Sequence, residues 1–239
     1  MRRSFDTPVQ VFRNNIDCTL HLLESLRALN LRPHFVLAST PEVYGVNASL
    51  GAFQEDDPLR PANPYAASKA AQEALVHAYG QAYDIPYVIT RAGSYINPRR
   101  KDLALSAFAR QIVDAERRGD HFTLRHGNLD TVRPWCDARD IVEAYLLAAE
   151  KGLTGQTYNV GASPGVATRL GAVLDLLLAQ AKVPVELKLD PALLRPTDVT
   201  YQALDVGRFS RLTGWEPKIP LHDSLQWLLQ SMRAGGSTV

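Results

Sequence analysis

The sequence of 239 residues predicts an α/β protein whose strands form a mainly parallel sheet. Short β-rich runs alternate along the chain with amphipathic helical segments of roughly 10–15 residues, which is the order that βαβ units produce. The first of these runs is short and apolar throughout, as expected for a strand that helices bury on both faces. These two observations predict the fold class before any single motif is considered.

The individual elements follow from hydrophobic spacing. The first is a helix, because Ile16, Leu20, Leu23 and Leu26 recur at helical intervals. The next expected elements are a strand over 34–38, a long helix from Pro64, a strand over 87–90, a helix around 105–113, a short strand over 121–124 and a helix around 141–148. After Gly155 the expected units are a strand over 157–160, a helix over 170–181, a strand over 185–189 and helices near 206–213 and 224–232.

Composition excludes several classes of protein and partner. Lys and Arg number 26 against 25 Asp and Glu, so there is no basic excess for binding nucleic acid. No apolar run approaches the ~20 residues that span a bilayer, and no apolar stretch follows the two arginines near the start, so neither a membrane partner nor a secretory signal is expected. The two cysteines form no CxxC, which predicts no disulfide framework, no metal site and a cytoplasmic protein.

The strongest group of candidate catalytic residues is Thr40, Tyr65 and Lys69. Tyr65 and Lys69 are spaced i, i+4 near the start of the long predicted helix, so their side chains share one face. A lysine held close to a tyrosine hydroxyl favours the phenolate and lowers the pKa of the tyrosine. Thr40 follows the first predicted strand, at the edge where open α/β sheets bind ligands. The YxxxK spacing alone also arises by chance and in ordinary helix-surface pairs, so the surrounding motifs must show whether it belongs to a catalytic site.

Motifs along nearly the whole chain supply that context. They are NIDCT at 15–19, ASTPEVYG at 38–45, EDDPLRP at 55–61, PYAASK at 64–69, RPW at 133–135 with Asp140 after it, YNVG at 158–161 and TGWEP at 213–217. With these motifs the chain resembles the extended short-chain dehydrogenase/reductase family of nucleotide-sugar enzymes. GNLD at 127–130 and LRPTDV at 194–199 are similar to its branch that acts on GDP-hexoses. That branch contains GDP-mannose 4,6-dehydratase and GDP-4-keto-6-deoxymannose reductase.

The resemblance implies a role for each catalytic candidate. Tyr65 would be the acid or base on the sugar O4, with Lys69 as its pKa modulator and a ribose contact, and Thr40 as its hydroxyl partner. Glu42 matches the glutamate that removes the C5 proton in the dehydratases, although an acidic residue also occurs there in some related reductases. The implied cofactor is NADP or NAD, which Tyr65, Lys69 and Arg100 would contact.

The resemblance also implies the substrate contacts, namely Ser94, Asn128, Arg195 and Asp198. A planar guanidinium such as that of Arg195 suits phosphate or ribose oxygens. Ser94 departs from the family pattern, because it stands where the family has an asparagine that touches the substrate diphosphate. The implied substrate is a GDP-sugar. The implied assembly is a homodimer formed through the helix bearing Tyr65 and the helix before the first strand.

The family's architecture refines the fold prediction to a partial Rossmann-type parallel sheet that lacks its first strands, with a small C-terminal α/β substrate lobe. Residues 1–160 would form the remainder of the cofactor domain, with segments crossing to the lobe after residue 93, and residues 161–239 would form mainly the lobe. No GxxGxxG or GxGxxG turn occurs in the chain, although such a turn lets the backbone approach the cofactor pyrophosphate. We therefore expect the chain to begin after the first part of the family's cofactor domain.

Three functions remain open at this point. The first is an NAD(P)-dependent reductase acting at C4 of a GDP-hexose, because residues 152–160 and 214–221 resemble GDP-4-keto-6-deoxymannose reductase best. The second is GDP-mannose 4,6-dehydratase, which Glu42 and the segment 98–100 favour. The third is a catalytically inactive GDP-sugar-binding or partner protein, because the glycine turn is absent.

Overall fold

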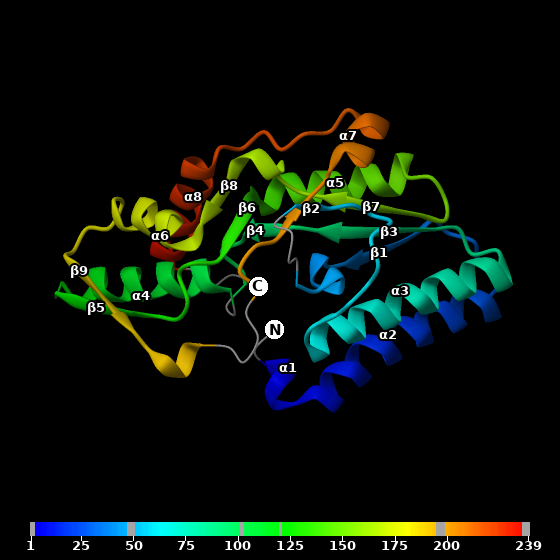
Figure 1. Cartoon of the computed structure of the whole chain (residues 1–239), viewed down its shortest axis with the longest axis horizontal. Coiled ribbons are helices and arrows are strands. Elements are labelled where there is room, and N and C mark those ends of the chain that lie inside the picture. The colour runs from blue at the N-terminus through cyan, green and yellow to red at the C-terminus, as the bar shows by residue number, and fades with distance from the viewer. Residues whose placement is uncertain (1–2, 47–50, 101–102, 120, 195–198, 236–239) are drawn as a thin grey trace.

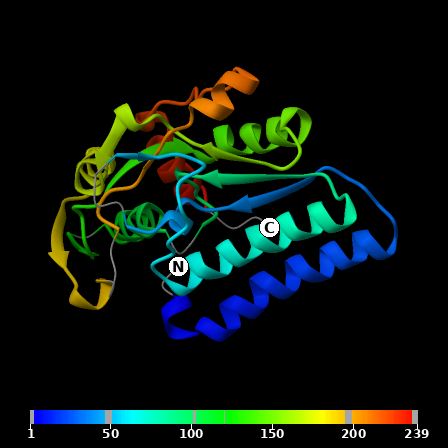
Figure 2. The same cartoon turned by 45° about the vertical axis from the view of Figure 1, so that its right-hand side comes forward.

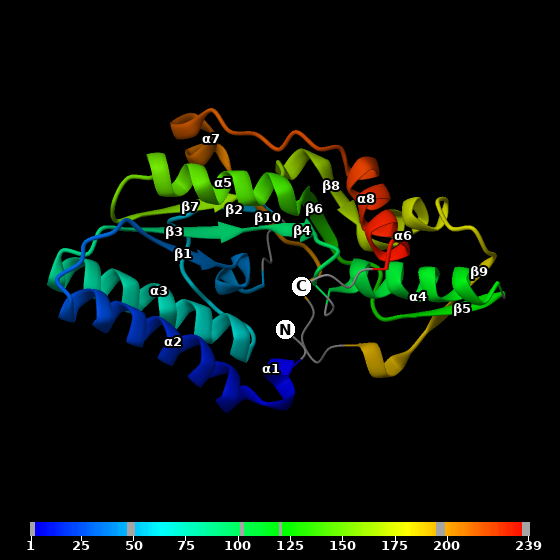
Figure 3. The same cartoon turned by 180° about the vertical axis from the view of Figure 1, so that it is seen from behind.

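The computed structural model describes residues 3–46, 51–100, 103–119, 121–194 and 199–235. Its main sheet has three parallel strands in the order β1 (Phe35–Ser39), β3 (Tyr87–Ala92) and β7 (Gln156–Val160). Helices α2 (Pro8–Ala28) and α3 (Pro64–Tyr83) lie side by side along one face, while α5 (Ala138–Lys151) and α7 (Gly207–Thr213) lie on the other (Figures 1 and 3). The result is the α/β arrangement that the sequence predicts.

The central strand β3 shows why its sequence is apolar throughout. All six of its residues are buried, and successive side chains point to opposite faces of the sheet. Val88 packs in the cluster that includes α5, whereas Ile89 packs in the cluster formed with α2 and α3. A strand covered by helices on both faces has no solvent-facing positions, so no alternation of polar and apolar residues is needed.

Helices α2 and α3 form the outer layer on their side of the sheet, as Figure 2 shows from a second direction. Leu23 on α2 and Val76 on α3 are almost fully buried where the two helices meet the sheet. Polar contacts add to this packing, because the Asn15 side-chain amide donates to Ser68 Oγ at 2.8 Å and the Gln72 amide donates to the Asn15 carbonyl at 2.9 Å. The pair therefore packs as a unit against β1 and β3.

A second hydrophobic core occupies the C-terminal lobe. It is surrounded by α4 (Ala104–Arg118), α6 (Leu170–Leu178) and α8 (Leu221–Arg233). In this lobe β5 (Phe122–His126) pairs in parallel with β9 (Val185–Leu189), and β4 (Ser94–Ile96) pairs in parallel with β6 (Val132–Asp137), which pairs antiparallel with β8 (Ala167–Arg169). Each core contains residues from both sides of position 160. Phe209, after that position, packs in the core at the main sheet, and Phe108, before it, packs in the core of the lobe. The division at 160/161 stays a prediction.

The predicted long elements all occur, with ends shifted by a few residues. The elements that the sequence did not predict are α1 (Arg3–Asp6), the parallel pair β2 (Ala52–Phe53) and β10 (Ala203–Leu204), and strands β4, β6 and β8. Most of them are only two to four residues long and so carry no measurable period. β6 is longer but contains Pro134, and proline usually argues against a strand. Within the described ranges, no helix is both long enough and apolar enough to cross a membrane.

Candidate active site

The first part of the site is the turn that follows β1. Strand β1 ends at Ser39, and Thr40 then caps the short helix η1 (Pro41–Tyr44) by accepting a hydrogen bond from the Glu42 N–H at 3.4 Å. Thr40 and Glu42 are each only 8% exposed. Gly45 ends the turn at φ +82°, and a Cβ there would lie 1.9 Å from the Arg60 carbonyl oxygen, so no other residue fits.

The second part is the start of α3, which Asn63 joins to the turn. The Asn63 side-chain oxygen caps α3 by accepting from the Ala66 N–H at 2.9 Å, and Pro64 occupies the first helical turn, as is common. The Asn63 amide also donates to the Glu42 carboxylate at 2.9 Å. One residue therefore fixes the start of the helix that carries Tyr65 and orients the predicted proton-abstracting carboxylate.

Tyr65 stands between these two parts. Its hydroxyl lies close enough to the Thr40 side chain for the two to interact. Burial raises the pKa of Tyr65 above its usual value of 10.0, the Thr40 contact and the positive charge of Arg100 act to lower it, and Glu42 acts to raise it. The structure thus brings together Thr40, Glu42 and Tyr65, and it places Arg100 close enough to act on the Tyr65 hydroxyl.

Lys69 lies one turn further along α3, and its role as a partner of Tyr65 stays a prediction. Its ammonium donates to Gln72 Oε1 at 2.8 Å, and Tyr65 lacks the lowered pKa that a neighbouring lysine was expected to cause. Burial lowers the pKa of Lys69, and the negative charge of Glu73 opposes that shift. The geometric reason is the i, i+3 neighbour Gln72, which offers an acceptor on the same side of the helix.

Behind these residues lies a buried polar network centred on the ion pair of Glu73 and Arg91, each 5% exposed. The pair is bidentate, with Arg91 Nε donating to Glu73 Oε1 at 3.0 Å and Arg91 Nη2 donating to Glu73 Oε2 at 2.6 Å. The Ser39 hydroxyl also donates to the Glu73 carboxylate. Because Ser39 directly precedes Thr40, the network joins the end of β1 to the helix that carries Tyr65 and Lys69.

The predicted substrate contacts are spread over the chain. Ser94 begins β4 and lies in the wall of a small pocket near the turn at Pro41. Asn128 lies in the loop after β5, in the lobe, where its side-chain oxygen accepts from the Asp130 N–H at 2.8 Å. Arg195 and Asp198 lie outside the described residues.

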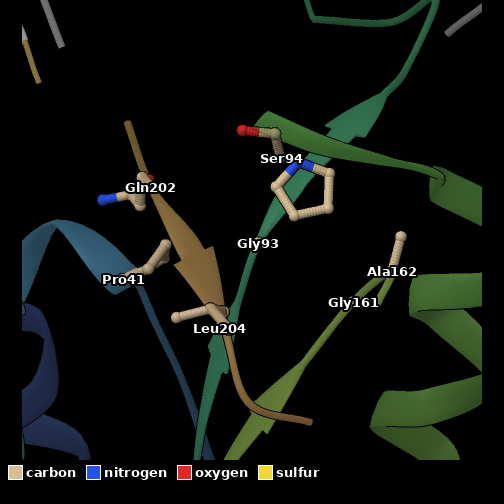
Figure 4. A pocket seen from close by; sticks show the side chains of 8 residues that line it. Pro41, Gly93, Ser94, Gly161, Ala162, Gln202 and Leu204 are labelled. Carbon is tan, nitrogen blue, oxygen red and sulfur yellow. The ribbon is translucent and has the colours of Figure 1, made fainter. Parts of the chain in front are cut away.

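The pocket is formed where the three strands of the main sheet end (Figure 4). Pro41 follows β1, Gly93 follows β3, and Gly161 follows β7. Ligands of open α/β sheets bind at this edge, outside the carboxyl ends of the strands. The position is therefore the one where a substrate or cofactor is expected.

The comparisons with known proteins identify the family. The sequence profile described as GDP-mannose 4,6 dehydratase matches residues 1–227, nearly the whole chain. The chain belongs to this family. Its fold places it among Rossmann-like short-chain dehydrogenase/reductase structures, as predicted. The family consists of sugar-nucleotide dehydratases and their relatives, so the sequence resemblance is confirmed at that level.

Three family relatives are informative. The chain is 31% identical to GDP-6-deoxy-D-mannose reductase of Pseudomonas aeruginosa over 95% of this chain and 74% of the relative. It is 30% identical to human dTDP-D-glucose 4,6-dehydratase over 83% of this chain, and it spans 56% of that relative's length. The solved structure of RMD from Pseudomonas aeruginosa complexed with NADPH superposes with a TM-score of 0.89 at 28% identity, covering 98% of this chain and 77% of that one.

The structure also shows residues that sequence reasoning missed. Asn63 was detectable, because asparagine directly before a proline at the start of a helix is an N-cap signal. Glu73 was partly detectable as the next i+4 position after Lys69 on the same helix face. Gln202, which lines the pocket from the far end of the chain, carries no local signal at all.

Proposed function

We propose that the chain is an NAD(P)-dependent enzyme acting at C4 of a GDP-hexose, most like a GDP-4-keto-6-deoxymannose reductase. The observation that carries this proposal is that Thr40, at the carboxyl end of β1, lies close enough to the Tyr65 hydroxyl to lower its pKa. A ligand at that edge would meet two hydroxyl groups that can share the oxygen of a sugar carbonyl. The name of the Pseudomonas relative supports the choice of sugar and reaction.

In this reaction Tyr65 gives its hydroxyl proton to O4 as the C4 ketone becomes an alcohol. Burial raises the pKa of Tyr65, so the neutral phenol, which is the form that donates a proton, predominates at neutral pH. Thr40 holds the Tyr65 hydroxyl in place and offers a second hydrogen bond to the same oxygen. When bound, a reduced nicotinamide cofactor supplies the hydride that C4 accepts.

The residues present fit such a cofactor. A lysine ammonium has three N–H donors, and for Lys69 one of them is directed to Gln72 Oε1. The remaining donors suit the hydroxyl groups of a cofactor ribose. Arg100, whose positive charge already acts on Tyr65, lies on the same side of the site and suits the negative charge of a dinucleotide.

The decisive experiment supplies the purified chain with NADPH and GDP-4-keto-6-deoxymannose and follows absorbance of the reduced cofactor. Turnover that disappears in Tyr65→Phe, while affinity for the nucleotide remains, is the expected result. Titration of the chain with NADPH by calorimetry addresses the inactive alternative. Saturable micromolar binding contradicts that alternative, and no binding at millimolar NADPH contradicts the reductase.

GDP-mannose 4,6-dehydratase is the second candidate, because the Glu42 carboxylate is buried beside Tyr65 and held by Asn63. A carboxylate fixed in this position suits removal of the C5 proton. The test is incubation with GDP-mannose and NADP. Formation of a 4-keto product contradicts the reductase assignment, and its absence together with active reduction contradicts the dehydratase.

We also infer a homodimer that uses α2 and α3. These helices lie side by side on the outside of the molecule (Figure 1), and the apolar side chains of Val9 and Leu22 on α2 and of Leu29 just after it are exposed. A mass of twice 26.4 kDa by light scattering is expected.

We place the protein in the cytoplasm, because Cys18 and Cys136 are both free thiols.

A further inference from the structure

Gln72 lies where α3 packs against α2, the two helices that run side by side in Figures 1 and 2. The residue is 6% exposed, so its side-chain amide is almost completely removed from solvent. A buried amide destabilises the folded chain unless its hydrogen bonds are made within the protein. The partners of this amide therefore indicate why a polar side chain occupies the position.

Both ends of the Gln72 amide are occupied. Its nitrogen donates to the Asn15 carbonyl oxygen on α2 at 2.9 Å and also to the Thr19 hydroxyl. Its oxygen accepts from the Lys69 ammonium at 2.8 Å. A backbone carbonyl can only accept, so the amide nitrogen must face α2 and the amide oxygen must face Lys69. The acceptor for Lys69 is thus held in place by a different helix from the one that carries Lys69.

The kind of acceptor matters for the charge of Lys69. Its i, i+4 neighbour Glu73 is already engaged in the bidentate ion pair with Arg91. Lys69 instead donates to its i, i+3 neighbour, whose amide is neutral. An ion pair with a carboxylate would cancel the positive charge of the ammonium. A neutral acceptor fixes the ammonium through one of its three N–H donors and leaves the charge uncancelled.

A lysine that is already fixed binds a ligand better than a mobile one. The flexible four-carbon stem of lysine has many rotamers, and these are lost when a ligand immobilises the ammonium. Ordering one such side chain during binding weakens affinity by roughly 3- to 10-fold. Where Lys69 is held by Gln72, most of this ordering takes place during folding instead.

We propose that Gln72 is a positioning residue, which holds the Lys69 ammonium in the place where it binds the cofactor. This inference rests on the proposed function, in which Lys69 contacts the ribose of a nicotinamide dinucleotide. Gln72 acts through Lys69, because its own amide is buried between the helices. A shift of α2 along α3 would move the acceptor and with it the ammonium.

Two substitutions separate the hydrogen bond from the packing. Gln72→Met removes both polar ends of the side chain and keeps its approximate length and helix preference. Gln72→Glu keeps an acceptor for Lys69 and replaces the donor to α2 with a second acceptor. Gln81→Met is the matched control, because Gln81 lies on the same helix and is exposed.

The first measurement uses the cofactor-free chain. Labelling with acetic anhydride between about pH 7 and pH 11, followed by mass spectrometry, reports the neutral fraction of Lys69. Gln72→Met should react roughly 3- to 10-fold faster below the pKa of Lys69, because the ammonium loses an acceptor and its pKa falls. Gln72→Glu should react more slowly, because a carboxylate raises that pKa. A change in access alone would alter the rate without moving the midpoint of the pH profile.

The second measurement is calorimetric titration with NADPH. Gln72→Met should bind NADPH roughly 3- to 10-fold more weakly than the wild type, because Lys69 must then be ordered during binding. Gln72→Glu should lose less affinity, because Lys69 keeps an acceptor. Gln81→Met should match the wild type in both measurements.

Several results would overturn the inference. An unchanged midpoint of Lys69 labelling in Gln72→Met, or an unchanged NADPH affinity, shows that Gln72 does no more than pack between the helices. If Gln72→Met does not fold, Gln72→Glu decides, and a pH profile like that of the wild type overturns the inference. No NADPH binding by the wild-type chain at millimolar concentration contradicts the proposed function and this inference together, whereas normal binding that Gln72→Met leaves intact contradicts this inference alone.

Discussion

The buried ion pair of Arg91 and Glu73 gives the sharpest prediction about stability. Arg91→Met removes both hydrogen bonds to Glu73, at 3.0 and 2.6 Å, and those to the Tyr44 hydroxyl at 2.7 Å and the Glu55 carbonyl at 2.9 Å. It leaves the Glu73 carboxylate, 5% exposed, with a hydrogen bond from the Ser39 hydroxyl. Breaking a buried pair in this way typically costs 3–5 kcal/mol, because one charge stays buried without compensation.

Equilibrium unfolding in urea measures this loss directly, and thermal unfolding should show a decrease of roughly 6–20 °C for a chain of this size. The control is the pair of Arg27 and Glu24, which has the same chemistry but side chains 42% and 40% exposed. Arg27→Met should leave the urea midpoint almost unchanged, because solvent screens an exposed pair.

The double variant Arg91→Met with Glu73→Gln completes the test. It should lose about 1–3 kcal/mol less than the sum of the two single variants, because the second change removes the charge that the first one strands. If Arg91→Met shifts the urea midpoint no further than Arg27→Met does, burial does not determine the contribution of this pair. That result would refute the reasoning.

Three further predictions concern the turn after β1. Gly45→Ala should lower stability by more than about 1 kcal/mol in urea unfolding, because its φ is +82° and its Cβ would clash with the Arg60 carbonyl; an unchanged midpoint would mean that the turn adjusts. Burial raises the pKa of Tyr44 to about 12, so its contribution to stability is complete below pH 10 and is lost as pH rises toward 12. Over that range the wild type should lose stability more steeply than Tyr44→Phe, and parallel curves would argue against this origin. Thr40→Val should reduce turnover in the NADPH assay without unfolding the chain, because it removes the hydroxyl that acts on Tyr65 and caps the turn, and full activity would show that Thr40 is dispensable.

The fold was largely predictable because its main elements are long and periodic. The buried run in β3 and the helical spacing of Leu23 and Leu26 result directly from packing on the sheet. The short strands could not be predicted in the same way. β2 and β10 form because residues 151 positions apart in the sequence, such as Ala52 and Ala203, meet in space. A two-residue segment has no periodicity from which such a pairing could be predicted.

In the candidate site, too, the residues in local sequence motifs could be predicted, and the contacts between distant residues could not. Thr40, Tyr65 and Glu42 lie within two short motifs, so the family resemblance was sufficient to predict them as candidates. The hydrogen bond from Lys69 to Gln72 was not predicted, because it depends on local packing as well as on spacing. The place of Gln202 in the pocket wall was not predicted either, because its neighbours in the sequence do not indicate which distant residues it meets.

The turn at Pro41 joins the candidate catalytic residues to the small pocket at the ends of the strands. On one side of it, Thr40 contacts Tyr65, and on the other, Pro41 itself forms a wall of the pocket. Proline fixes its own φ, and the cap at Thr40 and the glycine at position 45 hold both ends of the turn, so the two halves keep a constant spacing. A substitution at Thr40 should therefore act on turnover through the spacing of Thr40, Glu42 and Tyr65.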